Sequence, residues 1–246
     1  TRYPLVTGVQ TCALPICATC VHPKTKQVYD PWIGHIWDSI SQIRKWNPDM
    51  PVYMITGDHD ISLFENFEKY NVIRYTLKEL NPRYDLDQTN YAHTDQDSKS
   101  WLMRNFYIES LMSKLNLENV FSFDNDVLVF TDLSEVAKVC SEIYNGIAIT
   151  RESETNVIFG MCYIKNSNFL SMANDFFWQI INTEQGKTLM DMELWNVISR
   201  VKSDFVSNFP IWVDDEKQKL IGGIFDPISI GQFFGGTHWG NQPGMI

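Results

Sequence analysis

The first half of the chain alternates between one long helical pattern and short apolar runs. Apolar residues recur at helical spacing over 30–46, a stretch that opens on Asp-Pro and is followed by Asn-Pro. Short apolar runs at 52–55 and 72–75 predict buried strands, and a short helix is expected between them over 63–70. This alternation is typical of a sheet that is covered by helices.

The second half continues in the same way after a long polar loop over 81–97. A helix is predicted over 98–115, and a strand over 120–123 leads directly into Asp124-Asn125-Asp126. Further helices are predicted at 132–144, 167–181 and 186–201, and further strands at 147–150 and 157–164. The whole pattern predicts an α/β fold.

Composition supports a large folded core and narrows the class of partner. The 246 residues are 44% hydrophobic and carry a net charge of −10. An acidic chain repels phosphate backbones, so we expect no nucleic acid as the main partner. No apolar run is long enough to predict a membrane span. The five cysteines are odd in number in a long chain, which argues against a disulfide framework, and we expect a cytoplasmic protein.

The first residues look foreign to the rest of the chain. Thr1 to Ile16 resembles a translated sequencing adapter and has no clear helical or strand period. We therefore expect this segment to be non-native, to pack poorly and to be dispensable. The predicted domain is a single one over 17–246, truncated at both ends.

Paired carboxylates at the end of a buried strand are the main chemical signal. Asp124 and Asp126 follow an apolar run and are separated by one residue. Their charges repel and burial penalises ionisation, but a divalent cation resolves both problems. Mg²⁺ and Mn²⁺ take carboxylate, phosphate and water oxygens, so the segment predicts a metal and a diphosphate together. The alternative is a turn in which these side chains cap backbone amides.

Four segments in order resemble glycosyltransferases of the GT-A fold. They are the Asp-x-Asp segment FSFDNDVLVFTDL at 121–133, the preceding helix that carries Arg104, the strand FGMCYIKN that contains Gly160, and the late segment FDPISIGQFFGGTHWGNQPG at 225–244. The resemblance implies a Rossmann-like mixed central sheet flanked by helices. It also implies a metal-dependent transferase that moves a sugar from a nucleotide-diphosphate donor to a glycan, lipid or protein acceptor.

The resemblance also implies roles for particular residues. Asp126 would be the principal ligand of Mn²⁺ or Mg²⁺, and Asp124 would bind the metal or the donor ribose. Arg104, Asn125 and Gly160 would lie among the donor-binding residues. His238 is the candidate third metal ligand, although its segment lacks the Lys and the final Trp of the family pattern. Otherwise His238 is a surface loop histidine.

Three acidic residues are candidates for catalysis. Asp191 and Glu193 lie in DMELWN, which loosely resembles a D-Q-x-x-L-N segment of the same group. Two residues that are two apart on a helix do not share a face, so at most one of them points into the site. Both could instead belong to a solvated helix face. Asp226 is a candidate base on the acceptor side.

Two other functions remain open at this stage. Asp124-Asn125-Asp126 also resembles the start of a haloacid-dehalogenase-type phosphatase, in which the first Asp attacks phosphate. However, Leu128 stands where that motif has Thr or Val, and the motif lies far from the start of the chain. A catalytically inactive domain that binds nucleotide sugars is the third hypothesis.

Overall fold

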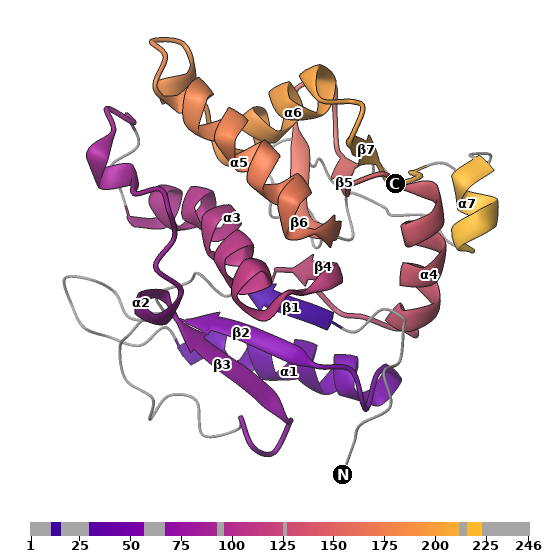
Figure 1. The fold of residues 1–246 in the computed structure, drawn as a ribbon. Coiled ribbons are helices and arrows are strands. Elements are labelled where there is room, and N and C mark those ends of the chain that lie inside the picture. The colour runs from indigo at the N-terminus through magenta and orange to yellow at the C-terminus, as the bar shows by residue number, and fades with distance from the viewer. Residues whose placement is uncertain are drawn as a thin grey trace, which may run out of the picture.

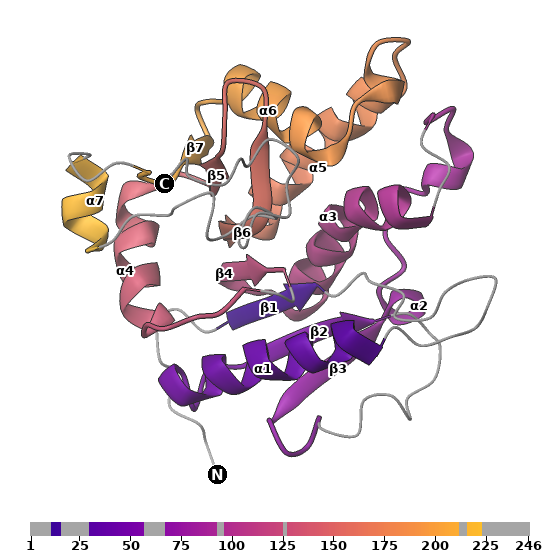
Figure 2. The ribbon, with the colours of Figure 1, turned by 180° about the vertical axis from the view of Figure 1, so that it is seen from behind.

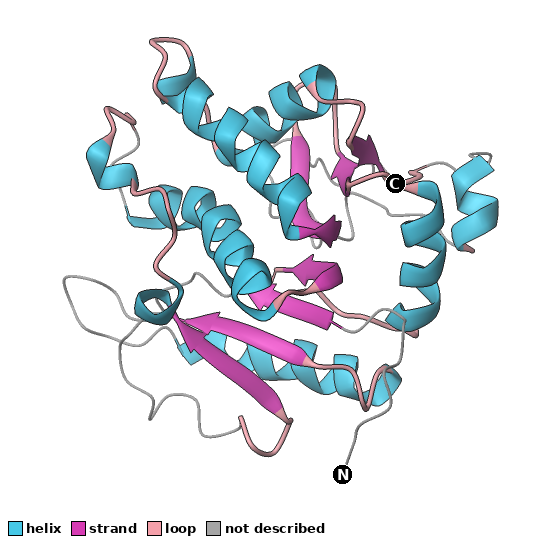
Figure 3. Cartoon of the chain, viewed as in Figure 1, coloured by secondary structure: helices cyan, strands magenta, loops and turns pink. Residues whose placement is uncertain are grey.

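The described part of the chain is a layered α/β structure. The computed structural model describes residues 11–15, 30–56, 67–92, 96–124, 127–211 and 216–222. Within these ranges, strands form a seven-stranded sheet with the order β3-β2-β1-β4-β6-β5-β7, and helices flank it (Figures 1 and 3). This confirms the predicted α/β class with a mixed central sheet.

Most of the longer elements follow the predicted order. The strands are β1 Thr11–Pro15, β2 Val52–Thr56, β3 Val72–Thr76, β4 Glu118–Phe123, β5 Ile147–Arg151, β6 Val157–Asn166 and β7 Val206–Asn208. The helices are α1 Asp30–Trp46, α2 Leu77–Leu80, α3 Gln96–Leu115, α4 Leu133–Ile143, α5 Ser167–Ile181, α6 Asp191–Val201 and α7 Glu216–Ile221, with 3-10 turns at Leu86–Gln88 and Gly186–Thr188.

Strand direction gathers several strand ends on one edge of the sheet. β3, β2, β1 and β4 pair in parallel, whereas β6 runs antiparallel between β4 and β5. β4 and β5 therefore point the same way, and their carboxyl ends lie on the same edge as those of β1 and β2. In open α/β sheets this edge is where ligands bind.

The expectation that residues 1–16 pack poorly does not hold for the backbone of Thr11–Pro15. This segment is β1, and it pairs in parallel with β2 on one side and with β4 on the other. Cys12 is in register with Val52 and with Phe121. Strand pairing satisfies backbone N–H and C=O groups and needs no side-chain alternation, which is why the sequence pattern failed to reveal it. The foreign origin of the segment stays a prediction.

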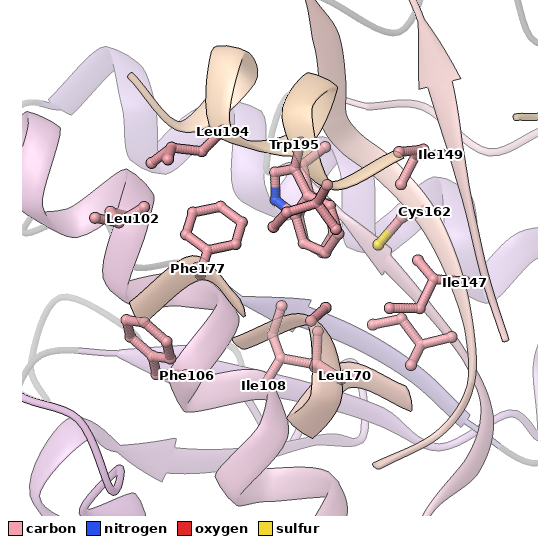
Figure 4. Close-up of a cluster of buried hydrophobic side chains, with 14 of the residues drawn as sticks. Leu102, Phe106, Ile108, Ile147, Ile149, Cys162, Leu170, Phe177, Leu194 and Trp195 are labelled. Atoms are coloured by element: carbon pink, nitrogen blue, oxygen red, sulfur yellow. The ribbon is translucent and has the colours of Figure 1, made fainter. Parts of the chain in front are cut away.

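Two apolar layers cover the two faces of the sheet. α3, α5 and α6 bury one layer, part of which Figure 4 shows around Trp195 and Phe177. α1 and α4 bury the other layer (Figure 2). Strand β6 supplies both, because Cys162 faces the first layer and Tyr163 faces the second. Cys140 on α4 belongs to the second layer.

Two helix predictions need correction. The helix predicted over 186–201 is divided, because a 3-10 turn ends at Thr188 and α6 begins at Asp191. Of the short helix predicted over 63–70, only 67–70 lie among the described residues, and they form a turn. No helix in the described ranges is both long enough and apolar enough to cross a bilayer.

Candidate functional site

Asp124 stands at the carboxyl edge of the sheet, one residue beyond β4. Its backbone N–H donates to the carbonyl of Gly160 on β6 at 2.7 Å. This bond continues the β4–β6 ladder, whose last paired residues are Phe123 and Met161. The backbone of Asp124 is therefore fixed by the sheet, although its side chain lies at the edge where ligands bind.

Arg104 joins Asp124 to the start of another helix. Its Nη1 donates to Asp124 Oδ1 at 2.6 Å, and its Nη2 donates to Asp191 Oδ2 at 2.9 Å. Arg104 comes from α3 and Asp191 is the first residue of α6. Three segments that are remote in sequence thus meet in one arginine bridge between two carboxylates.

The bridge is largely withdrawn from solvent. Side-chain exposure is 10% for Arg104 and 9% for Asp191, but 36% for Asp124. The guanidinium lies 5.3 Å from the centre of the Phe159 ring, and that ring stacks on Trp195 at 4.5 Å. The Phe159 ring, stacked on Trp195, lies against the Arg104 guanidinium. The guanidinium in turn bonds to Asp124, the most exposed member of the cluster.

Asp191 is the carboxyl of this cluster whose ionised form is disfavoured by burial. Burial raises the pKa of the Asp191 carboxyl above its ordinary value, and the charge of Asp124 adds to this, whereas the charge of Arg104 lowers it. Asp191 also occupies the first turn of α6, where the helix dipole favours a negative charge. Arg104 is therefore the group that allows two carboxylates to stand together here.

Glu193 does not join this cluster. Its Oε2 accepts a hydrogen bond from the backbone N–H of Met190 at 2.9 Å, which satisfies a donor at the start of α6. Of the two acidic residues in DMELWN, Asp191 is the one that meets Arg104 and Asp124. The geometry thus favours Asp191 over Glu193 as a site residue.

Four predicted site residues cannot be placed. Asn125, Asp126, Asp226 and His238 lie outside the described residues. Within the described ranges, no three His, Cys, Asp or Glu residues gather in a way that could hold a metal ion. The predicted metal set of Asp124, Asp126 and His238 therefore stays a prediction.

The chemistry of Asp124 nevertheless fits a hard cation. One of its oxygens bonds to Arg104, and no described residue bonds to the other. Mg²⁺ and Mn²⁺ are commonly held by one or two protein carboxylates, with phosphate and water oxygens completing the shell. A single half-exposed carboxylate at a strand end satisfies the protein's share of such a site.

The fold is shared with solved glycosyltransferases. An active-site variant of LgtC has a TM-score of 0.54 and 11% identity, and the match covers 88% of this chain and 84% of that one. The galactosyltransferase LgtC with donor and acceptor sugar analogues gives 0.52 and 10%, with the same coverage. GlyE of Streptococcus pneumoniae TIGR4 gives 0.50 and 12%, over 82% of this chain but only 45% of GlyE. The predicted GT-A-like fold is thereby confirmed.

These likenesses establish the fold and nothing finer. The chain spans less than half of GlyE. No protein-family model matches the sequence. No curated protein is significantly similar to it in sequence.

Sequence reasoning missed the aromatic support of the bridge. Phe159 was predicted only as part of a strand, yet its ring lies next to the Arg104 guanidinium. The available signal was its position directly before Gly160, on a strand that runs beside the Asp-x-Asp segment. A surface hollow lined by Asn81, Arg83, Glu109 and Ser113 is a separate feature and shares no residue with the bridge.

Proposed function

We propose that this protein is a metal-dependent glycosyltransferase that takes its sugar from a nucleotide-diphosphate donor. The fold, shared with LgtC and GlyE, supports this class of reaction. LgtC has been captured with donor and acceptor sugar analogues, which makes a sugar donor and a separate acceptor reasonable for this chain as well.

One observation carries the proposal. Asp124, at the carboxyl end of a parallel strand, is held by a buried arginine that is itself anchored to Asp191. Arranging two carboxylates around one charge at the ligand-binding edge costs desolvation energy that folding alone does not require. Such an arrangement is typical of a site that must bind charged groups in a defined position.

Four residues would bind the metal and the diphosphate of the donor. Asp124 and Asp126 would hold Mn²⁺ or Mg²⁺, with His238 as third ligand. When bound, the cation would neutralise the nucleotide diphosphate that leaves as the glycosyl bond breaks. Arg104 would orient Asp124 through its hydrogen bond, and its guanidinium would face the donor.

The remaining predicted residues would act around the transferred sugar. Asp191, buried beside Arg104, would accept hydrogen bonds from donor or acceptor hydroxyls. Gly160 and Asn125 would line the donor, and Asp226 would act as a base on the acceptor side. The acceptor itself would be a glycan, a lipid or a protein, and the reaction would take place in the cytoplasm.

A donor-hydrolysis panel tests this function. The full chain would be incubated with UDP-, GDP- and CDP-sugars, with Mn²⁺ and after removal of metal by EDTA. We expect release of nucleotide diphosphate from one donor class, and we expect EDTA to abolish it. Asp124→Asn and Asp126→Asn should both lose the Mn²⁺-dependent activity while keeping the wild-type circular dichroism.

Two further measurements separate the rival functions. Calorimetric titration with the nucleotide diphosphates would identify an inactive binding domain, which would bind the ligand in the presence of Mn²⁺ but release no product. A screen of phosphate monoesters would identify a phosphatase. Phosphatase turnover, with or without metal, or full activity in Asp126→Asn, would contradict the proposed function.

A further inference from the structure

A second arginine cluster stands on the same edge of the sheet, and it contains no carboxylate. Arg151, the last residue of β5, donates from Nη1 to Asn196 Oδ1 at 2.7 Å and from Nη2 to Ser199 Oγ at 2.8 Å. Arg200 donates from Nε to the same Asn196 oxygen at 3.3 Å. The uncharged amide oxygen of Asn196 on α6 thus accepts a hydrogen bond from each of the two guanidiniums.

Both guanidiniums have N–H groups that donate no hydrogen bond within the described part of the chain. A guanidinium carries five N–H donors. Hydrogen bonds use three of those on Arg151, including a long one of 3.4 Å to the Ser153 carbonyl. They use two of those on Arg200, the second being to the Glu154 carbonyl. Among the described residues, all acceptors of this cluster are neutral, so half of the N–H groups remain for a ligand.

The positive charge of the cluster is not neutralised by the chain around it. Within the described ranges, no carboxylate forms an ion pair with either arginine. Glu152 and Glu154 lie in the adjoining turn, and one oxygen of Glu152 is buried without a partner rather than bonded to an arginine. Burial lowers the pKa of the Arg151 guanidinium, and the charge of Arg200 lowers it further.

The cluster lies near the Asp124–Arg104–Asp191 bridge by two independent routes. Along α6, Asn196 follows Asp191 by five residues, which corresponds to about 8 Å. Along β6, Val157 pairs with Arg151, and Gly160 three residues later bonds to Asp124, which corresponds to about 10 Å. These backbone spacings place the two clusters within two turns of each other on α6 and along the same strand β6.

We propose that Arg151 and Arg200 form a binding site for an anionic group, a phosphate or a carboxylate, carried by the acceptor substrate. This rests on the proposed transferase function, because it assigns the donor's diphosphate to the Asp124 side. Two planar guanidiniums with spare N–H donors match the oxygen pairs of phosphate and carboxylate groups. The anion supplies the negative charge that the cluster lacks.

Anion binding can be measured without donor, acceptor or metal. The full chain, freed of divalent cations, would be titrated with inorganic phosphate and with glucuronate while the arginine Nε–H signals are followed by NMR. We expect saturable binding that shifts the signals of Arg151 and Arg200. Arg200→Gln should weaken the binding about tenfold or more, because a charge-assisted hydrogen bond is lost. The relative affinity of the two anions shows which anionic group the site prefers.

Matched variants keep the result interpretable. Arg200 is exposed, so Arg200→Gln tests the site even if Arg151→Gln weakens the packing of β5 on α6. Lys138→Gln removes one positive charge from the exposed surface of α4 and should leave anion binding unchanged. Absence of saturable binding, or equal binding by wild type and Arg200→Gln, would overturn the proposal.

A further readout separates this site from the donor site. If Arg200→Gln loses Mn²⁺-dependent donor hydrolysis in step with anion binding, the anion belongs to the donor, and the acceptor assignment is overturned. If the chain hydrolyses no donor at all, the transferase function fails, while anion binding by the arginine pair is still measured directly.

Discussion

Two arginines in this protein are each held between two carboxylates, yet their surroundings differ. The pairs are Arg104 with Asp124 and Asp191, and Arg83 with Glu109 and Asp175. The side chain of Arg104 is 10% exposed, whereas that of Arg83 is 41% exposed. The same three charges thus occur once at the ligand-binding edge of the sheet and once on an outer surface.

The outer cluster, formed by Arg83, Glu109 and Asp175, joins two segments of the chain and is called the tether below. Arg83 also donates to the carbonyl and the hydroxyl of Ser171, and the neighbouring Tyr84 bonds to Asp175 and stacks on Trp178 at 4.6 Å. These contacts tie the loop after α2 to α5. Arg83 and Asp175 are 41% and 44% exposed, so water screens much of their charge, whereas Glu109 is 10% exposed and also accepts a hydrogen bond from Asn174. The outer cluster contributes mainly contacts between segments, whereas the inner cluster concentrates charge where a ligand would meet it.

Removing each arginine is the strongest way to test this difference. Arg104→Leu leaves the buried carboxylate of Asp191 without its cation, and we expect the free energy of unfolding to fall by about 3–5 kcal/mol. Arg83→Leu removes a cation that is 41% exposed and leaves the buried Glu109 carboxylate with the hydrogen bond from Asn174, so we expect a smaller loss of about 1–2 kcal/mol. Urea denaturation of both variants at neutral pH measures the two values.

The difference between the two arginine clusters is measured by the ratio of these two losses in the free energy of unfolding. Double variants with the carboxylate partner neutralised, Arg104→Leu with Asp191→Asn, should recover part of the lost stability because the uncompensated charge is gone. Equal losses for Arg104→Leu and Arg83→Leu would show that burial does not distinguish the clusters.

Neutralising one carboxylate in each cluster separates activity from stability. Asp124→Asn should lower Mn²⁺-dependent donor turnover by roughly 10²-fold or more, because a cation ligand is lost at the reacting centre. Asp175→Asn, which makes the same change in the outer cluster, should leave turnover unchanged. Both variants should unfold within about 1 kcal/mol of wild type, since Asn still accepts a hydrogen bond from arginine. A matching loss of turnover in Asp175→Asn would assign catalytic importance to the tether.

The smallest expected effect concerns the tether at alkaline pH. Burial raises the pKa of Tyr84 from 10.0 to about 12, and the hydrogen bond to Asp175 adds to this. A group whose pKa is raised in the folded state stabilises it below the unfolded pKa, and this stabilisation is lost as the pH rises toward the folded value. Tyr84→Phe should therefore cost about 1 kcal/mol at pH 8.

The pH dependence supplies its own control. Between pH 10 and 12 the difference between wild type and Tyr84→Phe should shrink, whereas it should stay constant from pH 7 to 9. Urea unfolding at pH 8 and at pH 11 gives the two differences. A constant difference across the whole range would mean that burial and the hydrogen bond to Asp175 do not raise the pKa of Tyr84 in the folded protein.

Local periodicity was enough to predict most helices and strands of this fold. α3, α5 and β6 lie within two residues of their predicted ranges, because each has an apolar pattern of its own. β1 has no such pattern and exists through its two neighbours, so the sequence did not reveal it. The 3-10 turn and the late start of α6 depend on packing around Gly186 that no local signal encodes.

The candidate site was predictable in its members but not in its connections. Asp124, Arg104 and Asp191 were each expected in the site, yet the bridge joins residues that are 20 and 87 positions apart. Glu193 had a readable signal, since a Glu three residues into a helix often bonds back to the first backbone N–H. Which of two neighbouring acids enters the site is decided by such competing bonds.

Two cysteines within the described part of the chain, Cys140 and Cys162, are buried and can report when the interior opens to solvent. Cys140 and Cys162 lie on opposite faces of the sheet. Burial raises the pKa of both thiols, that of Cys140 to about 12. The thiolate is the nucleophile that attacks an alkylating reagent, so each cysteine reacts only when its own layer opens to solvent. The ratio of the two modification rates, measured by mass spectrometry of the labelled peptides, would show whether the two apolar layers open to solvent together or independently.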